Sequence, residues 1–313
     1  MEKRSKIVVG TAGWSYKDWN GIFYPDYLTS QKIHPLEYLA QYFDVVEVNT
    51  SFYGPLKPEL AKIWCRRVAA VNPRFVFTAK LYRSFTHSPL AITGPTSAAT
   101  IRPEPDDEAK TREGLDALAS EGKLGALLIQ FPISYKNSSL NREYIEELLQ
   151  RFEGYPCVVE VRHDTWDNPD SIAHFARMGV GFCNIDQPQI GRSLEPTEHV
   201  TSPIGYIRLH GRNYEQWFDS DSRDDRYNYL YNAGELAQWK DKIDAVAQKA
   251  RLTYVIANNH YEAKAGVNAL QLKNLLTGHR VKAPEPLLRR YPDLKKIADI
   301  GEEDRDPNLS LLA

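Results

Sequence analysis

Eight short apolar runs recur along this chain of 313 residues, and nearly all of them end on polar or charged side chains. The stretch 126–129 is apolar throughout and 158–161 is interrupted only by Glu160, as expected for parallel strands covered on both faces. The eight runs are Ile7–Gly13, Val45–Asn49, Phe75–Lys80, Gly125–Gln130, Cys157–His163, Gly181–Asp186, Tyr206–His210 and Leu252–Asn259. This repetition predicts an α/β fold, a single (β/α)8 TIM barrel with eight parallel strands.

Helix-like patterns lie between these runs. Apolar residues recur at helical spacing within 145–152, and Asn168–Pro169–Asp170 combines an N-cap residue with a proline suited to a first helical turn. No GxGxxG or GxxxxGK[ST] motif follows any of the runs. We therefore expect no nucleotide cofactor.

Three long segments follow the third, sixth and seventh predicted strands, at 86–107, 187–205 and 211–233. In a barrel they would all lie on the C-terminal rim, and the sixth βα unit is expected to be irregular because its segment has no helical pattern. Residues 1–280 are predicted to form the barrel domain. Residues 281–313 are predicted to form a C-terminal tail, either packed on the barrel or partly disordered.

The composition is that of an ordinary soluble protein, and a cytoplasmic location is expected. The formal net charge of −2 provides no general attraction to nucleic acid. No apolar run approaches the roughly 18 residues of a membrane-spanning helix, so no membrane association is expected. Residues 1–6 are charged and do not resemble a signal peptide. The three cysteines show no CxxC spacing.

Carboxylates and histidines gather at the predicted strand ends. Alternation along a strand places Glu160 and Arg162 on one face and His163 on the other, and Arg208 and His210 repeat the same spacing. A carboxylate beside a guanidinium stays ionised, which suits it to orienting a ligand. The predicted catalytic residues, for acid–base chemistry or proton transfer, are Glu47, Glu160, His163, Asp186 and His210.

Cationic side chains at three strand ends suggest an anion site. Lys80, Arg162 and Arg208 are predicted to hold a phosphate, sulfate or carboxylate, with arginine giving bidentate geometry. The aromatic-rich first rim loop offers either a stacking surface or a packed plug of the barrel mouth. The predicted ligand-binding residues are Trp14, Tyr16, Asn49, Lys80, His87, Gln130, Arg162, Arg208 and Asn258.

A divalent metal site is the alternative use of the same groups. His87, Glu160, His163, Asp186, His210 and Glu47 include the nitrogen and oxygen donors that a metal would need. No HxH or HExxH spacing supports such a site, and the neighbouring lysine and arginines would repel a cation. A metal is therefore not favoured, and no metal ligand is assigned.

Many of these motifs, in this order, resemble the YecE-like family, which is domain-of-unknown-function family seventy-two. The resemblance rests on Gly10–Tyr16, Trp19–Pro25, Val46–Tyr53, Phe75–Lys80, Thr86–His87, Gln130–Pro132, Val159–His163, Arg208–Gly211 and Asn258–Asn259. It implies a TIM barrel and supplies no established reaction or substrate.

These observations favour an enzyme, a hydrolase or an isomerase, that acts on a small anionic or phosphorylated, sugar-like ligand at the C-terminal rim. Two alternatives remain open. One is nucleic-acid binding or metal-assisted processing, in which rim aromatics stack on bases and arginines contact phosphates. The other is a non-enzymatic binding protein that uses the barrel mouth.

Overall fold

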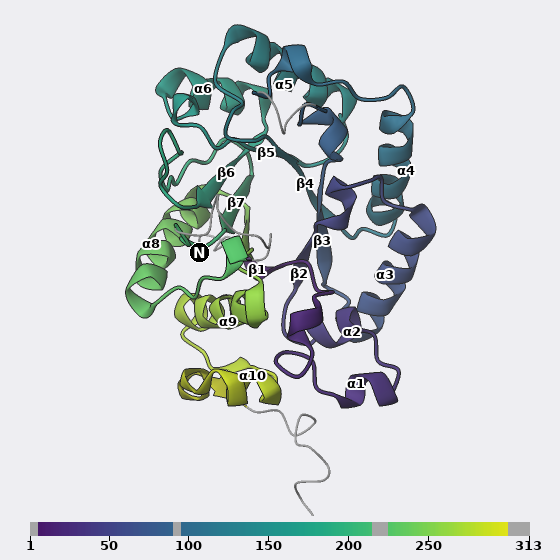
Figure 1. Cartoon of the computed structure of the whole chain (residues 1–313), viewed down its shortest axis with the longest axis vertical. Helices are drawn as coiled ribbons and strands as arrows, with labels where there is room; N and C mark the ends of the chain where they lie inside the picture. Colours follow the sequence, from purple (N-terminus) through teal and green to yellow (C-terminus); the bar gives the residue numbers. More distant parts are fainter. Residues whose placement is uncertain (1–5, 90–94, 215–224, 300–313) are drawn as a thin grey trace, which may run out of the picture.

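The computed structural model describes residues 6–89, 95–214 and 225–299. Within these ranges, eight parallel strands form a closed barrel in which each strand pairs with the next and β8 pairs with β1. The strands are β1 (Lys6–Ala12), β2 (Val45–Val48), β3 (Val76–Lys80), β4 (Leu124–Gln130), β5 (Cys157–Glu160), β6 (Gly181–Asp186), β7 (Ile204–Leu209) and β8 (Leu252–Ala257). The predicted barrel is therefore confirmed (Figure 1).

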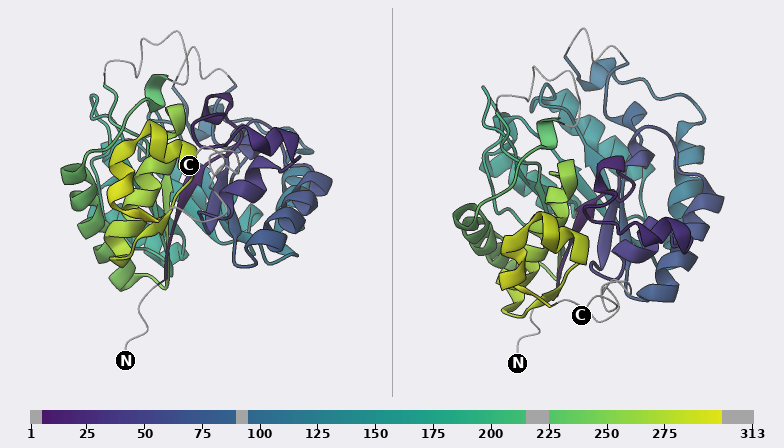
Figure 2. Two further views of the ribbon diagram at one scale, coloured as in Figure 1. Left: turned by 90° about the horizontal axis from the view of Figure 1, so that it is seen from below. Right: turned by 60° about the horizontal axis from the view of Figure 1, so that its bottom comes forward.

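Helices surround the barrel on its outside (Figures 1 and 2). They are α1 (Tyr27–Ser30), α2 (Pro35–Leu39), α3 (Pro58–Val71), α4 (Asp107–Ala119), α5 (Ser139–Arg151), α6 (Pro169–Met178), α8 (Ala233–Lys249), α9 (Lys264–Thr277) and α10 (Glu285–Arg290). The signals in the sequence explain their ends. Asn168 Oδ1 accepts a hydrogen bond from the Ser171 amide at 3.0 Å, and α6 stops at Gly179 with a φ of 67°.

The sixth unit lacks a helix, as predicted. All of residues 187–203 between β6 and β7 are described, and none of them is helical. Instead, this segment is bonded to the outward-facing side chain of Asn184 in β6. Asn184 Nδ2 donates to the His199 carbonyl at 2.9 Å, and Thr197 Oγ1 donates to Asn184 Oδ1 at 2.8 Å. A buried amide thus fixes the segment where a helix would otherwise cover the strand.

The strand register determines which side chains share the barrel interior. Paired residues of neighbouring parallel strands point to the same face. Glu47 pairs with Thr78, Gln130 pairs with Glu160, and Ile185 pairs with Arg208. Several polar side chains at the carboxyl ends of β2, β4, β5 and β7 therefore converge on one interior region.

The C-terminal segment packs beside α9 (Figure 1). Leu287 and Leu288 of α10 and the following Leu294 are buried in the same apolar core as the barrel. Residues 300–313 of the predicted tail lie outside the described residues. Among the helices of the described ranges, none combines the length and the apolar character that crossing a bilayer requires.

Candidate functional site

Arg208 lies at the centre of the polar interior and bridges two carboxylates. It extends from β7, and its side chain is only 1% exposed. Nη2 lies 2.7 Å from Glu47 Oε1, and Nη1 donates to Glu160 Oε2. The hydroxyl of Tyr206, two residues earlier on the same strand, donates to Glu47 Oε2 at 2.9 Å. We call Glu47, Glu160 and Arg208 the carboxylate clamp.

Burial alone would raise the pKa of Glu160, but the Arg208 and Arg162 guanidiniums outweigh it and hold that pKa well below its ordinary value. Nε and Nη2 of Arg162 both lie 2.7 Å from Glu160 Oε1. Glu160 is therefore an ionised group held by two arginines. Arg162 keeps 16% of its side chain exposed, in contrast to the nearly inaccessible Arg208.

His210 sits beside these arginines as a neutral ring. Burial and then the charges of Arg208 and Arg162 lower its pKa to about 3. Asn258 Nδ2 lies 2.9 Å from His210 Nδ1. Arg162 Nη2 and Arg208 Nη1 lie 3.3 and 3.4 Å from His210 Nε2, and Glu160 Oε1 lies 3.5 Å from the same nitrogen. The ring is therefore fixed by its neighbours on both sides.

Lys80 ends β3 and differs from both arginines. In the described part of the chain it forms no salt bridge, and its Nζ lies 4.2 Å from the centroid of the Phe52 ring. Burial of the ammonium and the nearby charge of Arg208 lower the pKa of Lys80 to about 7, although Glu47 and Glu160 oppose this change. Near neutral pH this amine exists in both protonation states.

His87 also contacts Phe52. Its ring meets the Phe52 ring edge to face at 5.0 Å, and its Nδ1 is 2.9 Å from Thr86 Oγ1. Burial and then the charge of Lys80 lower the pKa of His87 to about 3. His87 is therefore neutral beside the lysine.

Three further predicted ligand residues border this region. Asn49 follows β2, and its buried Oδ1 has no hydrogen-bond partner among the described residues. Burial raises the pKa of Tyr16, although a hydrogen bond from Asn49 opposes this change. The Tyr16 hydroxyl donates to the Ala12 carbonyl at 2.6 Å, and its ring stacks on His260 at 4.2 Å. Gln130 is buried next to Glu160 in the strand register.

The structure does not bring three of the predicted residues into this cluster. Trp14 packs edge to face against Trp64 of α3 at 4.8 Å, as part of the apolar core. The His163 side chain turns to the opposite face and accepts a hydrogen bond from the Thr165 amide at 3.2 Å. Asp186 also faces outward, where Arg212 Nε lies 2.9 Å from its Oδ2.

The metal-donor candidates are consequently dispersed. Glu47, Glu160 and His210 belong to the interior cluster, His87 lies beyond Lys80, and His163 and Asp186 face outward. Among the described residues, no group of three or more His, Cys, Asp or Glu side chains is arranged to hold a metal ion. The groups around Glu160 are instead guanidiniums.

Two residues of the cluster are absent from the sequence-based prediction. Tyr206 precedes Arg208 by two positions, so strand alternation could have identified it as another interior side chain. Phe52 lies in the turn Thr50–Phe52 after β2, and nothing in its spacing indicates that its ring will meet Lys80. That contact depends on how the turn after β2 approaches the end of β3.

Known proteins resemble this chain in sequence or in structure over most of its length. The UPF0759 protein YunF of Bacillus subtilis (strain 168) is 28% identical over 281 residues, covering 86% of this chain and 94% of the relative. A DUF72 family protein from Thermotoga maritima MSB8 superposes with a TM-score of 0.73 at 30% identity, over 87% of this chain and 99% of that protein. One from Enterococcus faecalis V583 gives 0.71 at 26% identity, over 86% and 95%.

The family assignment agrees with the order of motifs in the sequence. Residues 8–290 match the family described as "Protein of unknown function DUF72". The YecE-like resemblance is therefore confirmed, and the chain belongs to the DUF72 family.

Proposed function

We propose that the barrel mouth binds a small anionic ligand, through a carboxylate or phosphate group, and that the protein is an enzyme acting on it. The supporting observation is an excess of positive charge. Lys80, Arg162 and Arg208 are electrostatically coupled to only two carboxylates, Glu47 and Glu160, in the described interior cluster. Buried charge without a counter-ion is costly, so an anion would stabilise this arrangement.

The three cations divide between two roles. Arg208 is nearly inaccessible and already engages both carboxylates, so we assign it to positioning the clamp rather than to contacting the ligand. Arg162 has an exposed portion, and Lys80 has no carboxylate partner in the described residues. A ligand anion between Arg162 and Lys80 would gain charge-assisted hydrogen bonds from both.

The surrounding groups suit a ligand with hydroxyl or carbonyl oxygens. Asn49, Gln130 and Asn258 provide amides near the clamp, which can both donate and accept hydrogen bonds. An amine that titrates near pH 7 can exchange a proton with a ligand at physiological pH. Lys80 is therefore the proposed acid–base residue, and Glu47, Glu160 and His210 hold the framework around it.

Calorimetry with inorganic phosphate, small carboxylates and sugar phosphates would test the proposal. Arg162→Gln should weaken binding at least about tenfold, since a charge-assisted contact contributes roughly 1.5–3 kcal/mol. Arg192→Gln is the matched control, because Arg192 is 68% exposed and pairs with Asp164 outside the cluster. Failure of every such anion to bind the unmodified protein would refute the proposal.

The pH dependence of anion binding distinguishes the contribution of Lys80 from that of Arg162. A bound anion favours the ammonium form, so affinity should decline as the pH rises above about 7. Lys80→Arg should retain binding and remove this dependence, since arginine remains charged across this range. A decline that persists in Lys80→Arg would assign the titration to another group.

A further inference from the structure

We propose that the amine of Lys80 forms a covalent iminium with the carbonyl carbon of a small anionic oxo compound. The inference rests on the proposed function and names its substrate class: an oxo acid or a phosphorylated aldehyde or ketone. The anionic group would lie at Arg162, where the ammonium form of Lys80 also contacts it, and the carbonyl carbon would face Lys80 for attack by the neutral form.

The first argument is the setting of Lys80 among its neighbours. Arg162 and Arg208 are each fixed by direct contact with Glu160. Lys80, in contrast, forms no salt bridge within the described ranges, and its Nζ lies over the Phe52 ring at 4.2 Å. An aromatic face attracts the ammonium without accepting a short directed bond from it. The nitrogen is therefore held in place while its bonding positions remain available.

The second argument is the protonation state. Only the neutral amine carries the lone pair that attacks a carbonyl carbon, and an ordinary lysine is almost wholly protonated at pH 7. Burial and the charge of Arg208 lower the pKa of Lys80 to about 7. A large fraction of this side chain is therefore nucleophilic at physiological pH.

Lys123 provides an internal comparison. It lies immediately before β4, at the opposite end of the barrel, and is buried, whereas Lys80 is partly buried. Its Nζ donates to the Pro73 carbonyl at 2.5 Å. The Lys123 amine thus makes a directed hydrogen bond at one end of the barrel, whereas the Lys80 amine lies over an aromatic face at the other.

The covalent step is balanced without any additional reactant. The neutral Nζ adds to the carbonyl carbon, and the oxygen takes up a proton to give a carbinolamine. The carbon–oxygen bond then breaks, and the oxygen leaves as water while a carbon–nitrogen double bond forms. Overall, the ammonium and the carbonyl compound give the protonated iminium and water. No oxidation or reduction occurs.

Reductive trapping on the full-length protein would test this step. The protein is incubated with glyoxylate, pyruvate or dihydroxyacetone phosphate, treated with sodium borohydride, and analysed by intact mass and peptide mapping. At least one probe should leave a single reduced adduct on Lys80. Lys80→Arg should abolish this adduct, and Lys123→Arg should retain it. The two oxo acids and the ketone phosphate distinguish a carboxylate-bearing substrate from a phosphorylated one.

Three outcomes are informative. A Lys80 adduct whose yield falls at least about fivefold in Arg162→Gln supports both the iminium and the anion contact. No Lys80 adduct with any probe, together with retained phosphate binding, overturns this inference and leaves the proposed function standing. Equal labelling of Lys80 by neutral hydroxyacetone and by dihydroxyacetone phosphate, without phosphate binding, would refute the anion site and so the substrate class named above.

Discussion

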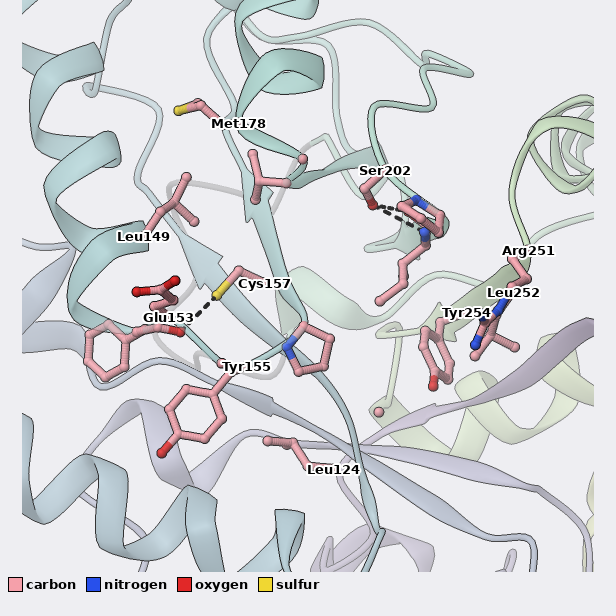
Figure 3. Close-up of a pocket in the computed structure, with 18 of the residues that line it drawn as sticks. Leu124, Leu149, Glu153, Tyr155, Cys157, Met178, Ser202, Arg251, Leu252 and Tyr254 are labelled. Atoms are coloured by element: carbon pink, nitrogen blue, oxygen red, sulfur yellow. Dashed lines mark hydrogen bonds between the residues drawn. The ribbon is translucent and has the colours of Figure 1, made fainter.

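The two ends of the barrel present opposite environments built from the same strands. β5 begins at Cys157, where burial raises the thiol pKa to about 12, and ends at Glu160, which is ionised between two arginines. Around the strand starts lies a cavity of about 650 Å³ (Figure 3). Its lining includes Leu124, Gly125, Cys157, Ile204, Leu252 and Tyr254. Ionised side chains therefore gather inside the barrel at its carboxyl end, while the amino end surrounds a cavity whose lining is mainly apolar and includes Glu153 and Arg251.

The largest expected effect is on the carboxylate clamp. Arg208→Met would leave Glu47 and Glu160 buried without their shared partner, and should cost about 3–5 kcal/mol in the free energy of unfolding. Denaturant unfolding would measure it. Arg280→Met is the surface control, because Arg280 pairs with Asp299 at 2.6 Å but is 54% exposed. Similar small losses in both variants would mean that the clamp is not the element stabilising the mouth.

The second largest expected effect is a loss of folding stability at low pH, caused by His210 at the barrel mouth. Burial and the two arginines lower the pKa of His210 to about 3, whereas histidine in an unfolded chain titrates near ~6.5. Between these pH values the unfolded chain binds a proton that the folded protein excludes. Stability should therefore fall by a few kcal/mol as the pH decreases from about 6.5 towards 3.

Unfolding curves across this pH range would measure the slope. His210→Gln should reduce it, and His279→Gln, at an exposed position, is the matched control. An unchanged slope in His210→Gln would indicate that other groups dominate the acid response.

At the amino end of the barrel, stability should depend on side-chain packing rather than on charge. A Cβ on Gly125 would lie 2.5 Å from the Tyr254 hydroxyl oxygen. Gly125→Ala should therefore cost roughly 1–3 kcal/mol through overpacking, with anion binding unchanged. Adding Tyr254→Phe should restore part of the loss, because it removes the nearest atom. A double-mutant cycle would test this coupling, and purely additive losses would exclude the contact as its cause.

The smallest expected effect comes from comparing Lys80 with the buried Lys123. Lys80→Met should stabilise the protein by about 1 kcal/mol, because it removes an ammonium that the fold disfavours. The gain should be largest below pH 7 and shrink as the pH rises from there towards the ordinary lysine pKa. Lys123→Met should instead destabilise, since it removes the hydrogen bond to Pro73. Destabilisation by both would show that Lys80 contributes to stability despite its lowered pKa.

Much of the interior cluster could be predicted from strand alternation. Glu160 and Arg162 were expected to share one face with His163 on the other, and the side chains lie that way. Alternation relates residues within one strand but does not say which face is the interior. Asp186 ends a strand as Glu160 does, yet its parity turns it towards Arg212. The position of Asp186 at the end of a strand was therefore not enough to predict which face its side chain would occupy.

The sequence by itself determined the barrel, because repeated apolar runs and helical patterns must bury both faces of a parallel sheet. It also determined that charged groups would meet at one rim. Only the tertiary structure decided how those charges pair, since Arg208 and Glu47 are 161 positions apart and meet through closure of the barrel. The same closure left Lys80 over Phe52 rather than beside a carboxylate. Local sequence patterns cannot specify that outcome, because it depends on register and loop approach across several strands.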